Sequence, residues 1–370
     1  MTNTSLARSS SSVTTSTPNR IAAAEHIAAE YARNELYELH EMSLAPGTLE
    51  CHQQDLRTFV AFLSEADLDP VPDAEALRTT PEAWRGIGFG LASAYRRWLL
   101  AMGYAQGTVS RKLSSVRVYA KLAASVDDTL AEKVSGVRMV GGHSGRLAAN
   151  IDDKRRDEGT PTRMSNKRRA EEMRALSPAE IKRLKGVCDV STPQGRRDAV
   201  LVALLLDHGL RIGEATGLVT AGTVRVGEDV HTVGLDLAAG TLRFYRQKVG
   251  ICQTIKLSSD ALVALRRYID AGDCPPMGYI LRGSRKGGRL THAGMTTTAA
   301  SARITELAKR AGLGHLSAHD LRHTWATVVS RRFPDRQAEL QQAGGWSSPA
   351  MLKRYVAPLE IANESIAISL

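Results

Sequence analysis

The sequence predicts a mainly helical protein of two domains, with a small antiparallel β-sheet in the second domain. Apolar residues recur at intervals of three and four over most of the chain, which is typical of helices with one buried face. Two strand-like segments, TLRFYRQ and ICQTIKLS, flank a short turn that contains Gly250. The 370 residues are 43% apolar, which is enough to fill two cores of ordinary size.

The first helical domain is expected over residues 21–136. Residues 1–20, ahead of it, are rich in Ser and Thr, contain no acidic residue and carry no apolar block. Such a segment cannot offset the entropy cost of ordering, so we expect a disordered tail. An organellar transit peptide has a similar composition, but it also has an amphipathic arginine pattern that this segment lacks.

One helix of this domain, TVSRKLSSVRVYAKLA, is basic beside an apolar stripe, with Thr108 as its expected N-cap. Two interpretations remain open: the basic face can follow a groove of a nucleic acid, or it can be the solvated face of a helix in a bundle. The residues that would contact a nucleic acid are Arg111, Lys112, Arg117 and Lys121.

The overall charge favours a polyanionic partner. The chain has 49 Lys and Arg against 39 Asp and Glu, a net charge of +10, and a pI near 9.6. The longest apolar run, 199–206, is too short to cross a bilayer, so we expect a core helix and a soluble, cytoplasmic protein with no membrane partner. The cysteines form neither a zinc-binding nor a disulfide pattern, and we expect free thiols at Cys51, Cys188, Cys252 and Cys274.

An interdomain linker is expected over 137–175, where the apolar periodicity gives way to glycines and mixed charges. The second domain is expected over 176–357. Its first helix carries an N-cap, a proline at the first helical position and a capping-box partner, which are Ser177, Pro178 and Glu180. The tail over 358–370 has apolar residues and few charges, so it can pack on its own domain or dock on a neighbouring subunit.

Two patterns in the second domain pair an arginine with a second polar group. In DHGLRIGEATGL, Gly209 is expected to end a helix, and Glu214 follows Arg211 by three residues, near enough to orient its guanidinium. Alone, such a pair is more often a surface ion pair. In HDLRHTWAT, a fixed cation lies beside groups that titrate near neutral pH, although such residues can also belong to a core; they are His319, Arg322 and His323.

Two further patterns are ordinary by themselves. Lys248 lies at the tip of the predicted hairpin, where a lysine is usually solvated, and Trp346 precedes Tyr355 in LQQAGGWSSPAMLKRYV, where aromatic residues usually pack. The whole set, in this order and within one domain, is much rarer than its members. On these residues the sequence resembles the tyrosine recombinase family, which includes phage integrases, Xer recombinases and Cre. The resemblance is strongest over 176–357 and weaker over 22–125.

The resemblance assigns roles to particular residues. Arg211 lies in the family's G-L-R-x-x-E-x-x-x-L context, and the hairpin and H-x-L-R-H elements also match. Trp346 stands where most members have histidine and where Cre similarly has tryptophan. The positions that the resemblance implies to be catalytic are Arg211, Lys248, His319, Arg322, Trp346 and Tyr355, with Glu214 and His323 as orienting residues.

The implied chemistry suits a phosphodiester. Two guanidiniums, Arg211 and Arg322, can hold the non-bridging oxygens as negative charge grows. A tyrosine has a pKa near 10 and needs a base, for which His319 is the candidate, while Lys248 suits the general acid that protonates the leaving oxygen. The division of proton transfer between these two stays open, because Trp346 can only donate a hydrogen bond.

The resemblance further implies a two-domain clamp on double-stranded DNA, and a site-specific recombinase that forms a 3′-phosphotyrosyl link. We expect neither metal nor ATP, since the sequence shows no carboxylate cluster suited to magnesium and no P-loop. The implied partners are inverted-repeat DNA sites, three further copies of the chain in a homotetramer, and accessory DNA-bending proteins on the nucleoid. The alternatives are a DNA-relaxing enzyme related to type IB topoisomerases and a DNA-binding protein with a degenerate active site.

Overall fold

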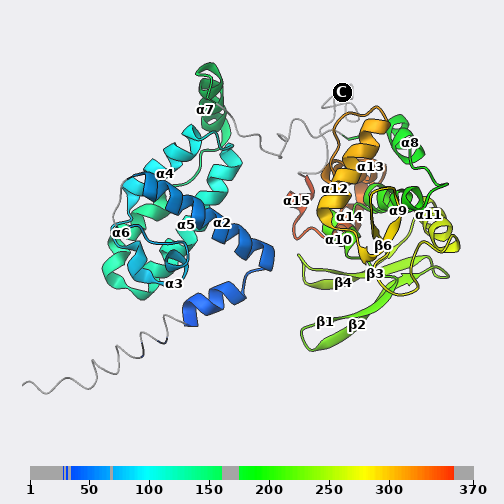
Figure 1. Ribbon diagram of the computed structural model, residues 1–370, viewed down its shortest axis with the longest axis horizontal. Coiled ribbons are helices and arrows are strands. Elements are labelled where there is room, and N and C mark those ends of the chain that lie inside the picture. The colour runs from blue at the N-terminus through cyan, green and yellow to red at the C-terminus, as the bar shows by residue number, and fades with distance from the viewer. Residues whose placement is uncertain (1–27, 29–30, 32–34, 67–69, 161–174, 354–370) are drawn as a thin grey trace, which may run out of the picture. The chain divides into compact units, whose positions relative to one another are not determined.

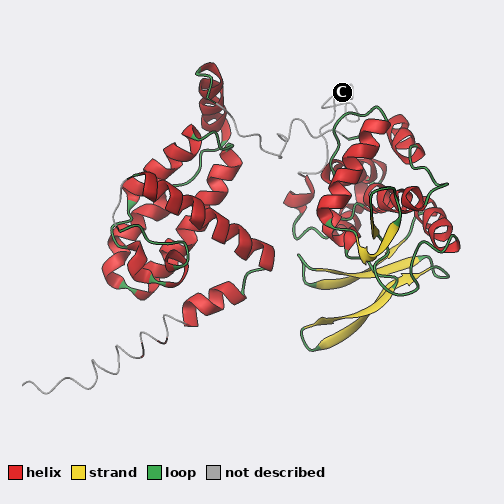
Figure 2. Ribbon diagram, in the orientation of Figure 1, coloured by secondary structure: helices red, strands yellow, loops and turns green. Residues whose placement is uncertain are grey.

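The computed structural model describes residues 28, 31, 35–66, 70–160 and 175–353, and the chain divides into two compact units, 1–167 and 168–370 (Figure 1). Helices dominate the described residues of both units, and the named strands lie in the second (Figure 2). The predicted class, mainly helical with a small antiparallel sheet, is confirmed. Among the helices formed by these residues, none has both the length and the apolar character of a membrane span.

The first unit is a helical bundle with its own apolar core. A helix over 35–42 precedes the bundle. Within the core, Leu56, Phe59 and Leu63 of one helix are buried with apolar residues of another, as the spacing of three and four predicts. The elements are α2 (Pro46–Glu65), α3 (Ala76–Thr79), η1 (Pro81–Trp84), α4 (Phe89–Ala101), α5 (Gln106–Val126), α6 (Asp128–Met139) and α7 (Gly145–Asp157).

Two features of this unit differ from the prediction. Helix α5 begins at Gln106 with Ala105 as N-cap, so Thr108 lies inside its first turn and does not cap it. Val137 and Val140 are buried in the first core, and α7 forms within the expected linker. The apolar pattern does not reveal α7 because pairs spaced by three or four residues support it instead, namely Asp152 with Arg155, Asp153 with Arg156 and Lys154 with Glu158.

The second unit combines helices with two sheets. Its helices are α8 (Pro178–Gly186), α9 (Pro193–His208), α10 (Ile212–Thr216), α11 (Ser259–Asp270), α12 (Thr297–Arg310), α13 (Ala318–Arg332), η3 (Pro334–Arg336), α14 (Gln337–Gly344) and α15 (Pro349–Lys353). The strands are β1 (Ala221–Val226), β2 (Asp229–Asp236), β3 (Thr241–Arg246), β4 (Ile251–Lys256), β5 (Arg282–Ser284) and β6 (Leu290–Gly294). The capping box of Ser177 and Glu180 at the start of α8 is confirmed.

The main sheet has four antiparallel strands in the order β1-β2-β3-β4, and helices lie on one side of it (Figure 2). The predicted hairpin is confirmed as β3 and β4, which pair from Thr241 with Lys256 to Arg246 with Ile251. Strands β1 and β2 were not predicted. No residue of either strand is buried, so their alternation of apolar and polar residues is weak.

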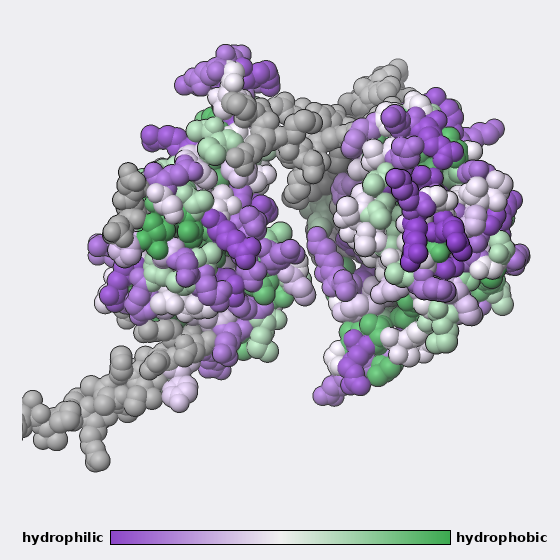
Figure 3. Space-filling view, viewed as in Figure 1, coloured by the Kyte–Doolittle hydropathy of each residue, from purple (hydrophilic) through white to green (hydrophobic). Residues whose placement is uncertain are grey.

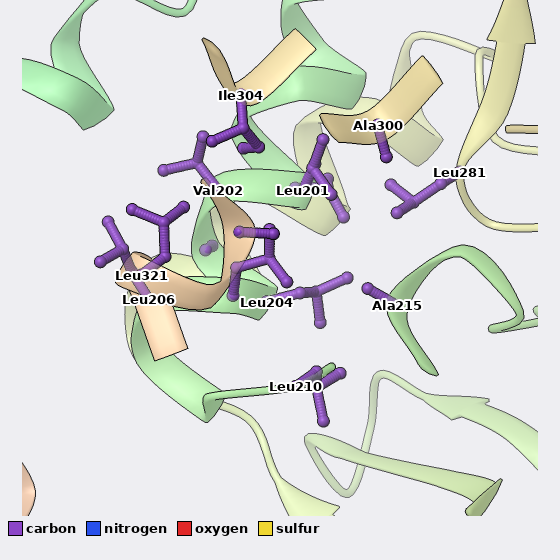
Figure 4. Packing of buried hydrophobic residues seen from close by; sticks show 14 of the residues in the cluster. Leu201, Val202, Leu204, Leu206, Leu210, Ala215, Leu281, Ala300, Ile304 and Leu321 are labelled. Carbon is purple, nitrogen blue, oxygen red and sulfur yellow. The ribbon is translucent and has the colours of Figure 1, made fainter. Parts of the chain in front are cut away.

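Helix α9 forms the centre of the second core. Its apolar run packs against α12 and α13, where Val202 lies near Ile304 and Leu321 (Figure 4). Each fully buried aliphatic side chain contributes about 1.5–3 kcal/mol. Gly209 ends α9 with a φ of 58°, as predicted, and a Cβ there would lie 2.0 Å from the ring of Trp325.

Candidate active site

The C-terminal end of α14 gathers side chains from three other parts of the second unit. A helix end leaves backbone carbonyls without intrahelical donors, and it attracts positive charge. Four successive carbonyls here accept hydrogen bonds, from Gln253 to Gln342 (3.0 Å), from Arg246 to Ala343 (2.5 Å), from Arg322 to Gly344 (2.6 Å) and from Arg211 to Gly345 (2.9 Å). Three guanidiniums therefore converge on this one helix end.

Arg211 is oriented by Glu214, as the sequence predicts. The left-handed turn at Gly209 places Arg211 at the N-cap of α10, and Glu214 lies in the first turn of that short helix. The backbone N–H and Nη1 of Arg211 each donate to the Glu214 carboxylate at 2.8 Å. The Arg211 side chain keeps 22% of its surface exposed, so its guanidinium can reach an external anion.

Arg322 is held more deeply, on the buried side of α13, where it is 1% exposed. Its Nη1 donates to the carbonyl of Gly209 at 2.5 Å, which fixes the turn that leads to Arg211. Its guanidinium lies over the ring of Trp346, 4.5 Å from the centroid. Trp346 is 4% exposed and in turn stacks on Trp325 at 5.8 Å. The Arg322 guanidinium thus packs on Trp346, which itself packs on Trp325.

The two glycines of GGWSS allow this close packing. A Cβ at Gly344 would lie 2.1 Å from the ring of Trp346, which is shorter than any real contact. Gly345 has a φ of 61°, and a Cβ there would meet Arg246 Cδ at 3.0 Å. A side chain at Gly344 would displace Trp346, and one at Gly345 would press on Arg246.

His319 lies in the first turn of α13, one turn before Arg322. Part of the His319 side chain is exposed to solvent. Burial of the remaining part lowers the pKa of His319, and the positive charge of Arg322 lowers it further. The imidazole is therefore neutral at pH 7 and can accept a proton. His323, by contrast, is 2% exposed and belongs to the interior.

The described contacts of this cluster do not include the two remaining predicted residues, Lys248 and Tyr355. Lys248 is exposed in the turn between β3 and β4, where no described contact joins it to the arginines. Tyr355 lies outside the described residues. Among the residues that the structure describes, no group of three or more His, Cys, Asp or Glu could hold a metal ion.

Arg246 belongs to the cluster but was missed in the sequence. It is fully buried, and its Nη1 donates to the second carboxylate oxygen of Glu214 at 2.8 Å. Burial lowers the pKa of Arg246 and Glu214 opposes this, but arginine stays charged in proteins. A signal was available, because the alternation of TLRFYR places Arg246 on the same inward face as Leu242 and Phe244.

The basic helix of the first unit is α5, and it divides the predicted DNA-contacting residues. Arg111, Arg117 and Lys121 are exposed, and Nη1 of Arg111 also donates to the Asp55 carboxylate at 2.5 Å. Hydrophilic side chains cover much of the visible surface of both units (Figure 3). Lys112 is 4% exposed and its ammonium lies 3.1 Å from the buried Asp55 carboxylate, so its prediction as a DNA contact is wrong. The Lys112 side chain can point inward because the Asp55 carboxylate neutralises its charge there.

Comparison with known proteins agrees with the family resemblance seen in the sequence. The sequence model of the phage integrase family matches residues 174–360. Tyrosine recombinase XerC of Oceanobacillus iheyensis is 23% identical over 312 residues, which cover 82% of this chain and 83% of XerC. Tyrosine recombinase XerD of Ralstonia nicotianae is 31% identical over 159 residues, which cover 42% of this chain and 46% of XerD.

The solved structures that share the fold include one bound to DNA. It is the XerH site-specific recombinase bound to a palindromic difH substrate in a post-cleavage complex. The TM-score is 0.53 at 15% identity, and the match covers 84% of this chain and 76% of that one.

Proposed function

This chain belongs to the phage integrase family of tyrosine recombinases, and we propose that Tyr355 is its nucleophile and that Arg211 and Arg322 hold the scissile phosphate. Members of this family cleave DNA strands and rejoin them, so the chain is a site-specific DNA recombinase. The observation that carries the site assignment is the joint fixation of Arg211 and Arg322 at one helix end beside Trp346. A DNA-relaxing enzyme is not favoured.

The two arginines would stabilise the negative charge that grows on the non-bridging oxygens of the phosphate. Two planar guanidiniums can donate to both non-bridging oxygens, and they are already oriented by Glu214 and Gly209, so little reorganisation is needed. Trp346 would support Arg322 and donate its indole N–H to the phosphate. This arrangement binds the transition state more strongly than the ground state, which is what accelerates the step.

The covalent step needs no reagent other than DNA and the side chains of this chain. The Tyr355 oxygen attacks phosphorus, and its proton passes to His319, which is neutral because its pKa is lowered. The bond from phosphorus to the 5′-oxygen breaks, and Lys248 protonates that oxygen. The products are a 3′-phosphotyrosyl link and a 5′-hydroxyl. Attack by a 5′-hydroxyl of another strand reverses the step and rejoins DNA.

DNA contacts beyond the active site would come from the first unit. Arg111, Arg117 and Lys121 lie on exposed positions of α5 and would bind phosphates, which position the protein without reading bases. Each lost phosphate contact should reduce the salt dependence of binding by about one unit of slope. The expected substrate is an inverted-repeat duplex on the nucleoid, bound by four copies with accessory DNA-bending proteins.

The tail over 358–370 would join neighbouring copies. A hollow of about 500 Å³ lies beside α13, and its lining combines apolar residues such as Leu206, Trp325 and Phe333 with charged ones such as Asp207 and Arg332. We assign it to the tail of a neighbouring subunit, because a tetramer needs a repeated contact of this kind. Deleting 358–370 should leave DNA binding intact and lower the yield of tetramer in sedimentation. An unchanged tetramer would place the tail on its own domain.

The nucleophile can be tested by covalent capture. A binding site is first selected from a random-sequence duplex library, and a nick is then placed near its centre so that cleavage traps the adduct. Wild-type protein should form a covalent complex, Tyr355→Phe should form none, and Tyr279→Phe is the matched control at an exposed tyrosine of the same unit. A covalent adduct formed by Tyr355→Phe would refute the assignment of Tyr355 as the nucleophile. A plasmid with two copies of the site should recombine.

A further inference from the structure

We propose that Arg246 is a positioning residue that acts on Arg211 through Glu214. The inference rests on the proposed roles of the site residues and adds a member that those roles do not include. Arg246 is fully buried, and each of its three guanidinium nitrogens donates to a group of the protein, so we place it behind the site and not against DNA.

The shared carboxylate is the basis of this coupling. Glu214 Oε1 accepts from Arg211 Nη1 at 2.8 Å, while Oε2 accepts from Arg246 Nη1 at 2.8 Å and from the Arg211 backbone N–H. A carboxylate held at both oxygens cannot rotate about its last bond. The carboxylate that orients the Arg211 guanidinium is therefore held in part by a bond that Arg246 makes on the far side of Glu214.

Arg246 is itself fixed at two other points. Its Nε donates to Gln253 on the neighbouring strand, and its Nη2 donates to the carbonyl of Ala343 at 2.5 Å. Gln253 donates from Nε2 to the carbonyl of Gln342 at 3.0 Å. The end of the β3–β4 hairpin next to its turn is thus bound to the end of α14, and Glu214 is anchored to that junction.

An apolar residue at this position would suit the inward face of the strand, but it could not replace these bonds. Leu242 and Phe244 occupy the two preceding inward positions and are buried. With an apolar side chain at 246, Glu214 Oε2 would lose the bond from Nη1 and the Ala343 carbonyl would lose its side-chain donor, both in a buried place. The carboxylate would then keep only the two bonds that Arg211 itself donates, and it would hold the Arg211 guanidinium less firmly.

The test measures the rate of covalent adduct formation on the nicked duplex described above, in single turnover. Arg246→Met should lower the rate about 100-fold and Arg246→Lys about 10-fold, the range seen when a supporting partner of an active-site group is lost. Binding to the intact duplex should stay within about threefold. Arg243→Met is the matched control, because Arg243 lies on the same strand but faces solvent. Its rate should equal that of wild type.

A double-variant comparison separates positioning from a general loss of structure. If Arg246 acts through Glu214, Glu214→Gln with Arg246→Met should be no slower than Glu214→Gln alone, within about threefold. Rates that multiply would overturn the proposal, as would Arg246→Met at the wild-type rate. If Arg246→Met does not fold, the same comparison is made with Arg246→Lys.

A sulfur-substituted duplex shows which active-site group is affected. Replacing the bridging 5′-oxygen by sulfur gives a leaving group that needs no general acid. Lys248→Met should recover on this duplex, whereas Arg246→Met and Arg211→Lys should both stay slow. Recovery of Arg246→Met would mean that it acts through the lysine hairpin, contrary to the proposal. The proposed function is tested separately: it holds if wild-type protein forms the adduct and Tyr355→Phe does not, whatever the rates of the Arg246 variants are.

Discussion

Replacing Trp346 would separate two properties of its indole, the ring that packs and the N–H that donates. The ring lies between Trp325, at 5.8 Å, and the guanidinium of Arg322, at 4.5 Å. Phenylalanine keeps an aromatic ring in that stack without an N–H, histidine keeps a donor on a smaller ring, and alanine keeps neither. The three variants therefore form a graded series.

The expected magnitudes follow from these contacts. Trp346→Ala should lower the free energy of unfolding by about 3–5 kcal/mol because it opens a cavity between Trp325 and Arg322. Trp346→Phe should lower it by about 1 kcal/mol. If the N–H donates to the phosphate, its loss removes a hydrogen bond to a charged group, worth about 1.5–3 kcal/mol. Adduct formation by Trp346→Phe should then be about 10- to 150-fold slower.

The assay measures adduct formation on the nicked duplex together with urea unfolding of the same samples. Trp346→His should cleave faster than Trp346→Phe although it is less stable, since only histidine supplies a donor. If Trp346→Phe cleaves within twofold of wild type while Trp346→Ala is inactive, the ring alone matters. In that case the role of the indole N–H at the phosphate is refuted.

Three further predictions concern stability and pH. Gly209→Ala should lower the free energy of unfolding by more than about 2 kcal/mol, because it combines a left-handed φ with a clash against Trp325; urea unfolding measures it, and a loss under 0.5 kcal/mol would contradict the geometry. Asp55→Asn should lower the stability of the first unit by about 3–5 kcal/mol, since it leaves the buried Lys112 without its counter-charge; a transition that is unchanged in thermal unfolding would count against this. Adduct formation should fall at acidic pH with a midpoint below the ordinary histidine pKa of 6.5, because the lowered pKa keeps His319 unprotonated to more acidic pH. A midpoint at or above 6.5 in the pH–rate profile would argue against His319 as the base.

Local features of this protein could be predicted from sequence because their causes are local. The capping box at Ser177 and the end of α9 at Gly209 depend on residues within one turn. The bond from Arg211 to Glu214 spans three residues, and the hairpin of β3 and β4 spans one turn. In each case the interacting groups are neighbours in the chain, so spacing alone brings them together.

The features that were missed depend on distant partners. Lys112 bonds to a carboxylate 57 residues earlier, and Arg246 bonds to a carbonyl 97 residues later. Periodicity shows that both positions face inward, but it does not show which group of the protein each side chain will contact. A charged residue at an inward position of a strand or helix is nevertheless a usable signal, since burial of a charge requires a partner.

The charge of the arginine cluster explains why it would bind a phosphate. Arg211, Arg246 and Arg322 repel one another, and the carboxylate of Glu214 can neutralise only one positive charge. The carbonyls at the end of α14 offset the remainder only in part, because they are dipoles. Arg246 is buried deeply enough to use its donors inside the protein, whereas Arg211 is partly exposed. The uncompensated charge is therefore presented at Arg211, where a phosphodiester would lower the energy of the whole cluster.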